Sequence, residues 1–277
     1  MKIAYCVSGH MRTFQETLEN QKNSFIDIND CDVFVYTSNF NTQVDGTGTT
    51  WDRHEDKRET HFLVEKENVY ETSKHFRAYE LDERNLAFQV ENCYGSRLKK
   101  YFIEQEKEEP KKLNMAPVHK NWNWIRERQV RKFYKCNELM HQYEKENNIK
   151  YDFVVRSRPD LLFKGKIFVN ELVEFFGEEE LKNSILVWGG WDPRGDLAEH
   201  GMKGYLFDGF AIGTPEVMDK YCDIYECADK PAPGKANNLE IQLKSYLINA
   251  NIVLRYLVNM TPQTKYVRDE YCYSICR

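Results

Sequence analysis

The sequence lacks the patterns that mark membrane, secreted and zinc-binding proteins. Its 277 residues contain no apolar run near the roughly 18–20 residues that span a bilayer, and no signal-like segment opens the chain. The eight cysteines form no Cys-x-x-Cys pair and no cluster with histidines, so we expect no zinc site. Without a signal segment, reduced thiols are the default. We therefore expect a soluble, cytoplasmic protein with no transmembrane segment.

Charge and glycine patterns exclude further classes. The formal net charge is −5 and acids and bases are interspersed, which argues against a general nucleic-acid binder. The Gly-x-Gly-x-x-Gly pattern is absent, so a dinucleotide-binding fold has no direct support. Hydrophobic residues make up 41% of the chain, enough for a sizeable core. No repeat, low-complexity tract or linker divides it, so we expect a single domain over residues 1–277.

Short apolar runs alternate with amphipathic segments, which predicts an α/β protein. Expected strands are residues 3–7, 32–38, 153–155, 161–163, 185–188, 207–213 and 252–257, with a weaker one at 76–82. We expect one helix that begins near Phe14 and three more at 121–147, 169–182 and 239–247. The helix at 121–147 has the clearest apolar face. Thr214 and Pro215 are typical of a helix start. We expect residues 39–60 to form a polar surface loop, and the charged segment 99–112 a solvated helix and loop.

The stretch 151–163 is the centre of the predicted fold. Its apolar residues 153–155 predict a strand buried on both faces. Pro159 cannot donate to a strand ladder, so regular pairing should end there and leave Arg156, Arg158 and Asp160 beside a crevice. Two guanidiniums and a carboxylate suit an anion such as phosphate, together with a divalent cation. The alternative is a structural Arg–Asp pair that closes a loop.

The first two strands also end in small polar residues. Gly9 permits a tight turn after Ser8, and a strand, a small-residue turn and a helix typically open nucleotide-binding α/β domains. Thr37 ends the second strand. Arg12 either reaches a phosphate or covers the sheet edge. We therefore expect these four residues to form the nucleotide part of a pocket.

Two later segments supply further candidates. Trp191 and Asp192 lie in a Gly- and Asp-rich segment that is either a sugar-stacking platform or an ordinary turn. Asp208 precedes Gly209 in an apolar strand, and a buried carboxylate needs a partner or a function. Gly209 leaves room beside it for a sugar ring. Glu240 is a second candidate carboxylate.

Four motifs in order carry a resemblance to a known family. They are residues 8–14 (SGHMRTF), 32–37 (DVFVYT), 151–160 (YDFVVRSRPD) and 208–218 (DGFAIGTPEVM). The set resembles a group of GT-A-type glycosyltransferases of bacterial surface-polysaccharide loci and large algal viruses, over roughly residues 2–257. The resemblance implies a GT-A-like (Rossmann-like) α/β/α sandwich with a mixed, mostly parallel sheet. It also implies a nucleotide-binding half, about 1–165, and an acceptor-binding half, about 166–277.

The resemblance further implies transfer of a hexosyl or pentosyl group from a nucleotide-sugar, expected to be a UDP-sugar, to a hydroxyl of a glycan acceptor. Such enzymes carry an Asp-x-Asp motif that binds Mn²⁺ or Mg²⁺, and here Arg158 replaces its first acid. Asp160 would be the metal ligand, with Arg156 or Arg158 neutralising diphosphate charge. Asp208, Asp192 and Glu240 are candidate bases, with Asp208 preferred. A nucleotide-sugar-binding pseudoenzyme and a carbohydrate-binding module are the alternatives, and a nucleotidyltransferase is a third, weaker one.

Overall fold

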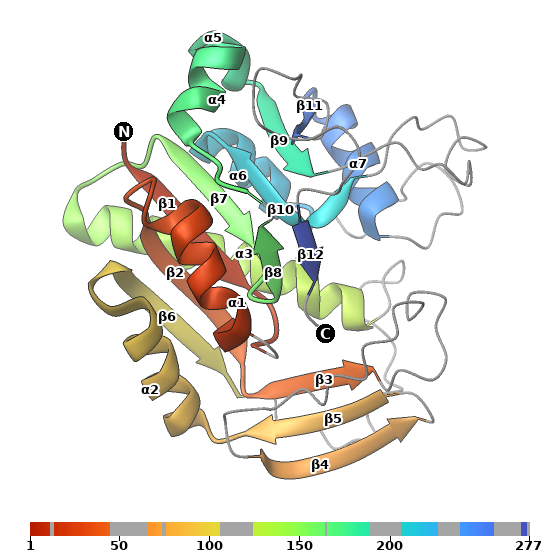
Figure 1. Ribbon diagram of the computed structural model, residues 1–277. Helices are drawn as coiled ribbons and strands as arrows, with labels where there is room; N and C mark the ends of the chain where they lie inside the picture. Colours follow the sequence, from red (N-terminus) through yellow and green to blue (C-terminus); the bar gives the residue numbers. More distant parts are fainter. Residues whose placement is uncertain are drawn as a thin grey trace.

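A seven-stranded sheet with helices on both faces forms the main body of the molecule, and a smaller sheet lies beside it (Figure 1). The structure is a computed structural model that describes residues 1–11, 14–44, 66–73, 76–105, 124–163, 165–188, 206–226, 239–257 and 273–275. In the main sheet the strand order is β11-β9-β10-β7-β1-β2-β6. Its strands are β1 (Ile3–Ser8), β2 (Asp32–Ser38), β6 (Leu98–Glu104), β7 (Phe153–Ser157), β9 (Ser184–Trp188), β10 (Phe207–Gly213) and β11 (Val253–Tyr256).

One strand of the main sheet runs against all the others. β10 pairs antiparallel with both of its neighbours, β7 and β9, whereas every other neighbouring pair is parallel. The sheet is therefore mixed and mostly parallel, as predicted. Because of its reversed direction, β10 begins at the edge of the sheet where β1, β2 and β7 end.

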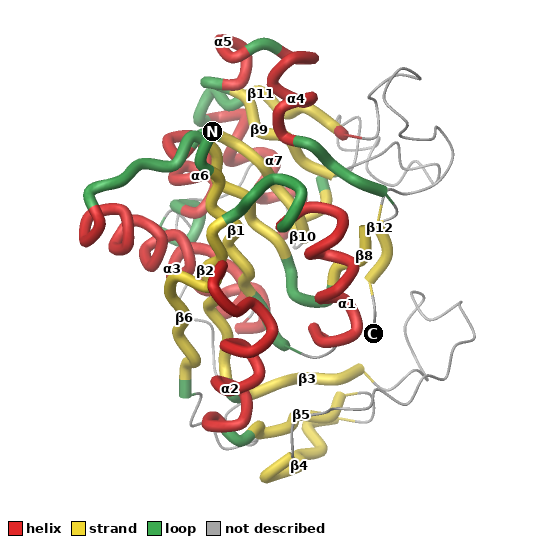
Figure 2. Tube along the Cα trace, turned by 60° about the vertical axis from the view of Figure 1, so that its left-hand side comes forward, coloured by secondary structure: helices red, strands yellow, loops and turns green. Residues whose placement is uncertain are grey.

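The central strands are buried because helices cover both faces of the sheet. In β1, Tyr5 and Val7 pack into one hydrophobic cluster while Ala4 and Cys6 pack into the other, as expected from the two-residue period of a strand. On the first face lie α1 (Phe14–Gln21), α2 (Glu83–Tyr94), α4 (Val169–Phe176) and α5 (Glu178–Leu181). On the second lie α3 (Trp124–Asn147), α6 (Pro215–Cys222) and α7 (Leu239–Asn249). Figure 2 shows α1 and α3 on opposite sides of the sheet.

Short elements complete the described chain. A π-helical turn, Lys22–Ile26, extends α1, and a 3-10 turn, Gly95–Arg97, follows α2. A three-stranded antiparallel sheet in the order β3-β5-β4 joins β3 (Phe40–Val44), β4 (Lys66–Ser73) and β5 (Phe76–Leu81). β8 (Leu161–Phe163) pairs antiparallel with β12 (Tyr273–Ile275).

Several local predictions were wrong. Residues 98–104 form β6, an edge strand of the main sheet, and not a solvated helix. The segment expected to be a loop from residue 39 includes β3. The weaker strand expected at 76–82 is confirmed as β5, which pairs in the smaller sheet. Thr214 does precede α6, with Pro215 as the first residue of the helix, but the Thr214 hydroxyl makes no capping hydrogen bond.

In the part of the chain described above, no helix is both long and apolar enough to cross a bilayer.

Candidate active site

Four strand ends bring the predicted charged residues together. β1, β2 and β7 end at one edge of the sheet, where β10 begins, so Asp208 lies at the same edge as Arg156 and Arg158. The register between β10 and β9 shifts between Phe207 and Ala211. A bulge of this kind re-aims side chains and is common beside active sites. Residues separated by about fifty positions in the sequence therefore share one site.

Arg156 is a buried cation at the end of β7. Its side chain lies on the sheet face covered by α3, and its guanidinium carbon is 3.8 Å from the centre of the Phe133 ring. Within the described residues, none of its three guanidinium nitrogens makes a hydrogen bond. Burial lowers the pKa of Arg156, and the nearby Tyr221 and Asp208 offset this only in part. A buried cation that lacks hydrogen-bond acceptors is costly, and it fits a group that meets an anionic ligand.

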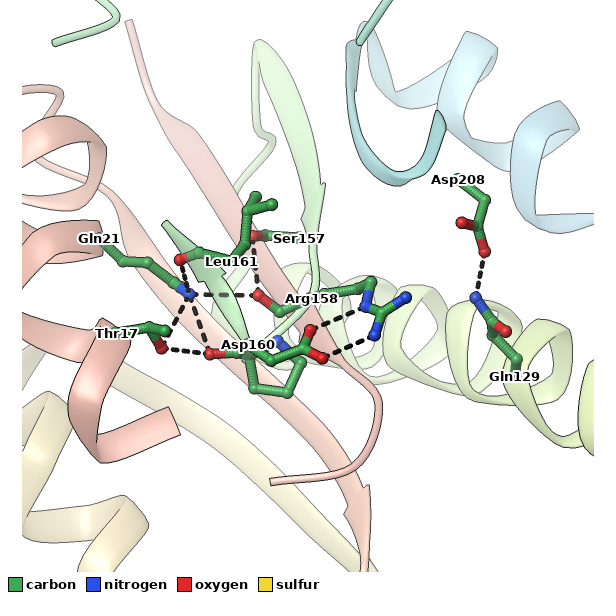
Figure 3. A network of polar contacts seen from close by, with 9 residues as sticks. Thr17, Gln21, Gln129, Ser157, Arg158, Asp160, Leu161 and Asp208 are labelled. Carbon is green, nitrogen blue, oxygen red and sulfur yellow. Dashed lines mark hydrogen bonds and ion pairs between the residues drawn. The ribbon is translucent and has the colours of Figure 1, made fainter. Parts of the chain in front are cut away.

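Arg158 and Asp160 form a bidentate ion pair across Pro159 (Figure 3). Nε of Arg158 donates to Oδ1 of Asp160 at 2.8 Å, and Nη2 donates to Oδ2 at 2.6 Å. Burial lowers the pKa of Arg158, but the carboxylates of Asp160, Asp208 and Glu240 outweigh it and raise the pKa. Asp160 is 2% exposed, whereas the Arg158 side chain retains 18%. The arginine, and not the carboxylate, is thus the group that a ligand can reach.

Helix α1 holds the turn that carries this pair. Nε2 of Gln21 lies within hydrogen-bond distance of three carbonyl oxygens of the turn, those of Arg158 (3.2 Å), Pro159 (3.0 Å) and Leu161 (2.9 Å). Thr17 also donates to the Pro159 carbonyl. Neither Thr17 nor Gln21 was predicted from the sequence to belong to the site. The one sequence feature that could have indicated them is their spacing, because a Thr and a Gln four positions apart lie on the same face of α1, the face that packs on the sheet.

Asp208 is buried and in contact with helix α3. Gln129 of α3 donates to its Oδ2 (Figure 3), and the Tyr221 hydroxyl lies 3.4 Å from its backbone carbonyl. Gly209 accepts a 3.0 Å hydrogen bond from the backbone N–H of Arg158, which ties β10 to the turn after β7. Glu240 lies in the first turn of α7, near enough to raise the pKa of Arg158 and of Tyr221. The structure therefore brings two of the three candidate bases, Asp208 and Glu240, near the arginines.

The turn after β1 lies against the same site. Gly9 has a φ of +142°, and a Cβ there would lie 3.2 Å from Cδ of Pro159, so both the backbone and the space favour glycine. The Thr37 hydroxyl donates to the Gly9 carbonyl at 2.8 Å. Ser8 is fully buried, and its hydroxyl has no hydrogen-bond partner in the described chain. Ser8 follows Val7, the residue opposite Ser157, and therefore lies across from Arg158.

Three of the predicted site residues lie outside the described residues: Arg12, Trp191 and Asp192. Their roles stay predictions.

The predicted Mn²⁺ or Mg²⁺ ion has no complete ligand set among the described residues. These cations bind sets of oxygen ligands, and no group of three or more His, Cys, Asp or Glu side chains suited to a metal occurs in the described ranges. Both oxygens of Asp160 accept from Arg158, so a cation at Asp160 would have to displace a guanidinium. The described residues thus fit an anion better than a metal ion.

Three solved structures illustrate what the chain is similar to, and all three are distant likenesses. No protein-family model and no curated protein matches the chain. Among solved structures, an active-site mutant of LgtC is 10% identical with a TM-score of 0.45, over 99% of this chain and 86% of that one. The galactosyltransferase LgtC with donor and acceptor sugar analogues has the same identity and coverage and a TM-score of 0.46. A nucleoside-diphosphate-sugar pyrophosphorylase from Vibrio cholerae is 12% identical, with a TM-score of 0.39, over 92% of this chain and 90% of that one. Likenesses of this size decide neither family nor activity, so function has to be inferred from the site itself.

Proposed function

We propose that this protein is a GT-A-like glycosyltransferase that moves a sugar from a nucleotide-sugar, a UDP-sugar in the first instance, to a hydroxyl of a glycan acceptor. The observation that carries the proposal is the buried guanidinium of Arg156, which has no hydrogen-bond partner in the described chain and lies beside Asp208. A cation and a carboxylate at one edge of the sheet are what the two halves of glycosyl transfer require: the cation for the departing diphosphate, and the carboxylate for the acceptor proton.

The two arginines stabilise the departing diphosphate. When the bond between the sugar C1 and the diphosphate oxygen breaks, negative charge grows on that oxygen. Fixed donors that face this charge stabilise the transition state, because they need no reorganisation during the reaction. Arg156 is fixed by burial against Phe133, and Arg158 by its two bonds to Asp160. Arg156 is the next-to-last residue of the central strand and Arg158 directly follows it, at the strand end where ligands bind in open α/β sheets.

Asp208 acts on the acceptor hydroxyl. As the acceptor oxygen forms its bond to C1, it loses a proton, and Asp208 takes that proton as general base. Gln129 holds one of its oxygens by donating to Oδ2. Glu240, at the start of α7, is the alternative base.

A thermal-shift screen tests the proposal. Purified protein would be heated with UDP-, GDP- and CMP-sugars, each with Mn²⁺ and with EDTA, because a ligand of the native state raises the melting temperature by mass action. We expect one nucleotide class to stabilise the protein, and release of the free nucleoside diphosphate when a sugar acceptor is added. No shift with any nucleotide-sugar would refute the proposal. Stabilisation without turnover would favour the nucleotide-sugar-binding pseudoenzyme.

A further inference from the structure

The ion pair of Arg158 and Asp160 leaves several guanidinium donors without a partner among the described residues, and part of the Arg158 side chain is exposed. A guanidinium carries five N–H donors in a planar fork. Asp160 accepts one from Nε and one from Nη2, so both hydrogens of Nη1 and the second hydrogen of Nη2 have no partner in the described chain. Asp160 orients this fork, and Gln21 fixes the backbone on which both residues sit. The result is a cation held in a set direction at the end of the central strand.

We propose that Arg158 does the work of a divalent cation, so that binding of the donor diphosphate needs no metal, and that Asp160 is the positioning residue of Arg158. This inference rests on the proposed function and specifies how its donor is held. It replaces the prediction that Asp160 is a metal ligand.

Charge and burial support the arginine over the metal. A cation at Asp160 would have to separate an ion pair with two short, charge-assisted hydrogen bonds, one of whose partners is 2% exposed. It would then lie close to two further positive charges, those of Arg156 and Arg158. An anion would instead be attracted to this site, because Arg156 has no hydrogen-bond acceptor in the described chain and Arg158 has spare donors. Diphosphate oxygens would accept from the spare donors of Arg158 in a planar, two-point contact, and the buried positive charge of Arg156 would attract them as well.

Calorimetry with two probes, UDP and inorganic pyrophosphate, tests the inference. Each probe would be titrated into the protein in EDTA and in Mn²⁺. We expect the two affinities for each probe to agree within about twofold. Affinity at least about tenfold weaker in EDTA would overturn the inference. Pyrophosphate binding in EDTA without any binding of UDP would sustain the arginine site and refute the proposed function instead. No binding of either probe would overturn both.

Substitutions separate the two roles of Asp160. Arg158→Met should weaken pyrophosphate binding in EDTA by about ten- to a hundredfold, because a charge-assisted two-point contact is lost. If Asp160 were a metal ligand, the same change would free its oxygens and strengthen Mn²⁺-dependent binding. Because Arg158→Met removes the arginine partner of a buried carboxylate, Arg158→Met combined with Asp160→Asn repeats the test without that negative charge. We expect the double variant to lose the same pyrophosphate affinity in EDTA and in Mn²⁺. A loss of affinity seen only in Mn²⁺ would overturn the inference.

Arg97→Met is the matched control. Arg97 also donates to carboxylates, those of Asp27 and Asp30, but it precedes β6 and lies at the opposite edge of the sheet. Its loss should leave pyrophosphate affinity unchanged. An equal loss in this variant would show that the effect is one of overall charge, and the inference would fail.

Discussion

The guanidinium of Arg156 is buried at a cost to the folded state. Its pKa is lowered because burial outweighs the attraction of Tyr221 and Asp208, which means that the site disfavours the charged form. Stacking of the guanidinium on the Phe133 ring offsets part of that cost. Residues that are unfavourable for stability and well placed for a ligand are common in active sites.

Arg156→Met is therefore expected to stabilise the protein and to weaken its ligand binding. A methionine of similar length fills the space without a charge, so the melting temperature should rise by a few degrees. Affinity for UDP or pyrophosphate should fall by about tenfold or more. Thermal denaturation and calorimetry on one preparation measure both. A clear drop in melting temperature would instead identify Arg156 as a structural residue.

Asp208→Asn should separate chemistry from binding. Asparagine keeps an oxygen that can accept from Gln129, so the fold and the donor affinity should stay close to those of the wild type. Without a base, the transfer rate should fall by about 10²–10⁴. Rates and donor affinity measured on the purified variant decide the point. An unchanged rate would move the role of base to Glu240, and loss of soluble protein would mean that Asp208 is structural.

Helix α1 determines the shape of the turn after β7. Gln21 is 1% exposed and reaches three carbonyls of the turn, and Tyr5 donates to its Oε1 at 3.2 Å. A carbonyl that loses its donor inside the protein costs roughly 1–3 kcal/mol. The helix therefore fixes the backbone from which Arg158 and Asp160 project.

Gln21→Leu should both destabilise the protein and impair the site. We expect the free energy of unfolding to fall by roughly 1–3 kcal/mol and pyrophosphate affinity to fall with it, because the turn loses its support. Denaturant unfolding and calorimetry measure the two effects. Gln15→Leu is the control, since Gln15 lies on the same helix but pairs with Gln89 of α2. Equal effects of the two changes on affinity would contradict a specific role of Gln21 in holding the turn.

Elements with a clear apolar period were predictable, and those shaped by tertiary contacts were not. The spacing of Val130, Phe133, Cys136 and Met140 predicted α3, and all four are buried. β6 was missed because Lys99, Lys100 and Glu104 dominate a short edge strand in which only Ile103 is buried. α2 and β12 were not predicted at all. The convergence of Arg156, Arg158 and Asp160 was predictable because they are neighbours in sequence, whereas Thr17, Gln21 and Gln129 join the site only through packing.

A histidine links helices α3 and α6 on the second face of the main sheet. His141 of α3 lies 2.6 Å from an Asp219 oxygen of α6 through Nε2, and 2.8 Å from a Glu144 oxygen through Nδ1. Lys150 also contacts Glu144, at 3.3 Å. The bond to Asp219, followed by that to Glu144, raises the pKa of His141 although burial lowers it.

This arrangement gives stability a pH dependence of known sign. A raised pKa in the folded state stabilises the protein below the unfolded value of about 6.5, and the contribution is lost as the pH rises through the folded pKa. The melting temperature of the wild type minus that of His141→Gln should therefore be positive near pH 6 and should shrink at higher pH. Melting curves across this range measure the difference. A difference that does not change with pH would show that His141 is not charged in the fold.

The reversed direction of β10 has a consequence for any attempt to divide the chain. β10 lies between β7 and β9, so the two predicted halves, 1–165 and 166–277, meet along a row of backbone hydrogen bonds. Expressed alone, the first half would present β7 as a bare outer strand whose five residues are all buried in the intact protein. Such a strand recruits other chains by edge-to-edge pairing. The fragment should therefore aggregate, and co-expression of the second half should rescue it.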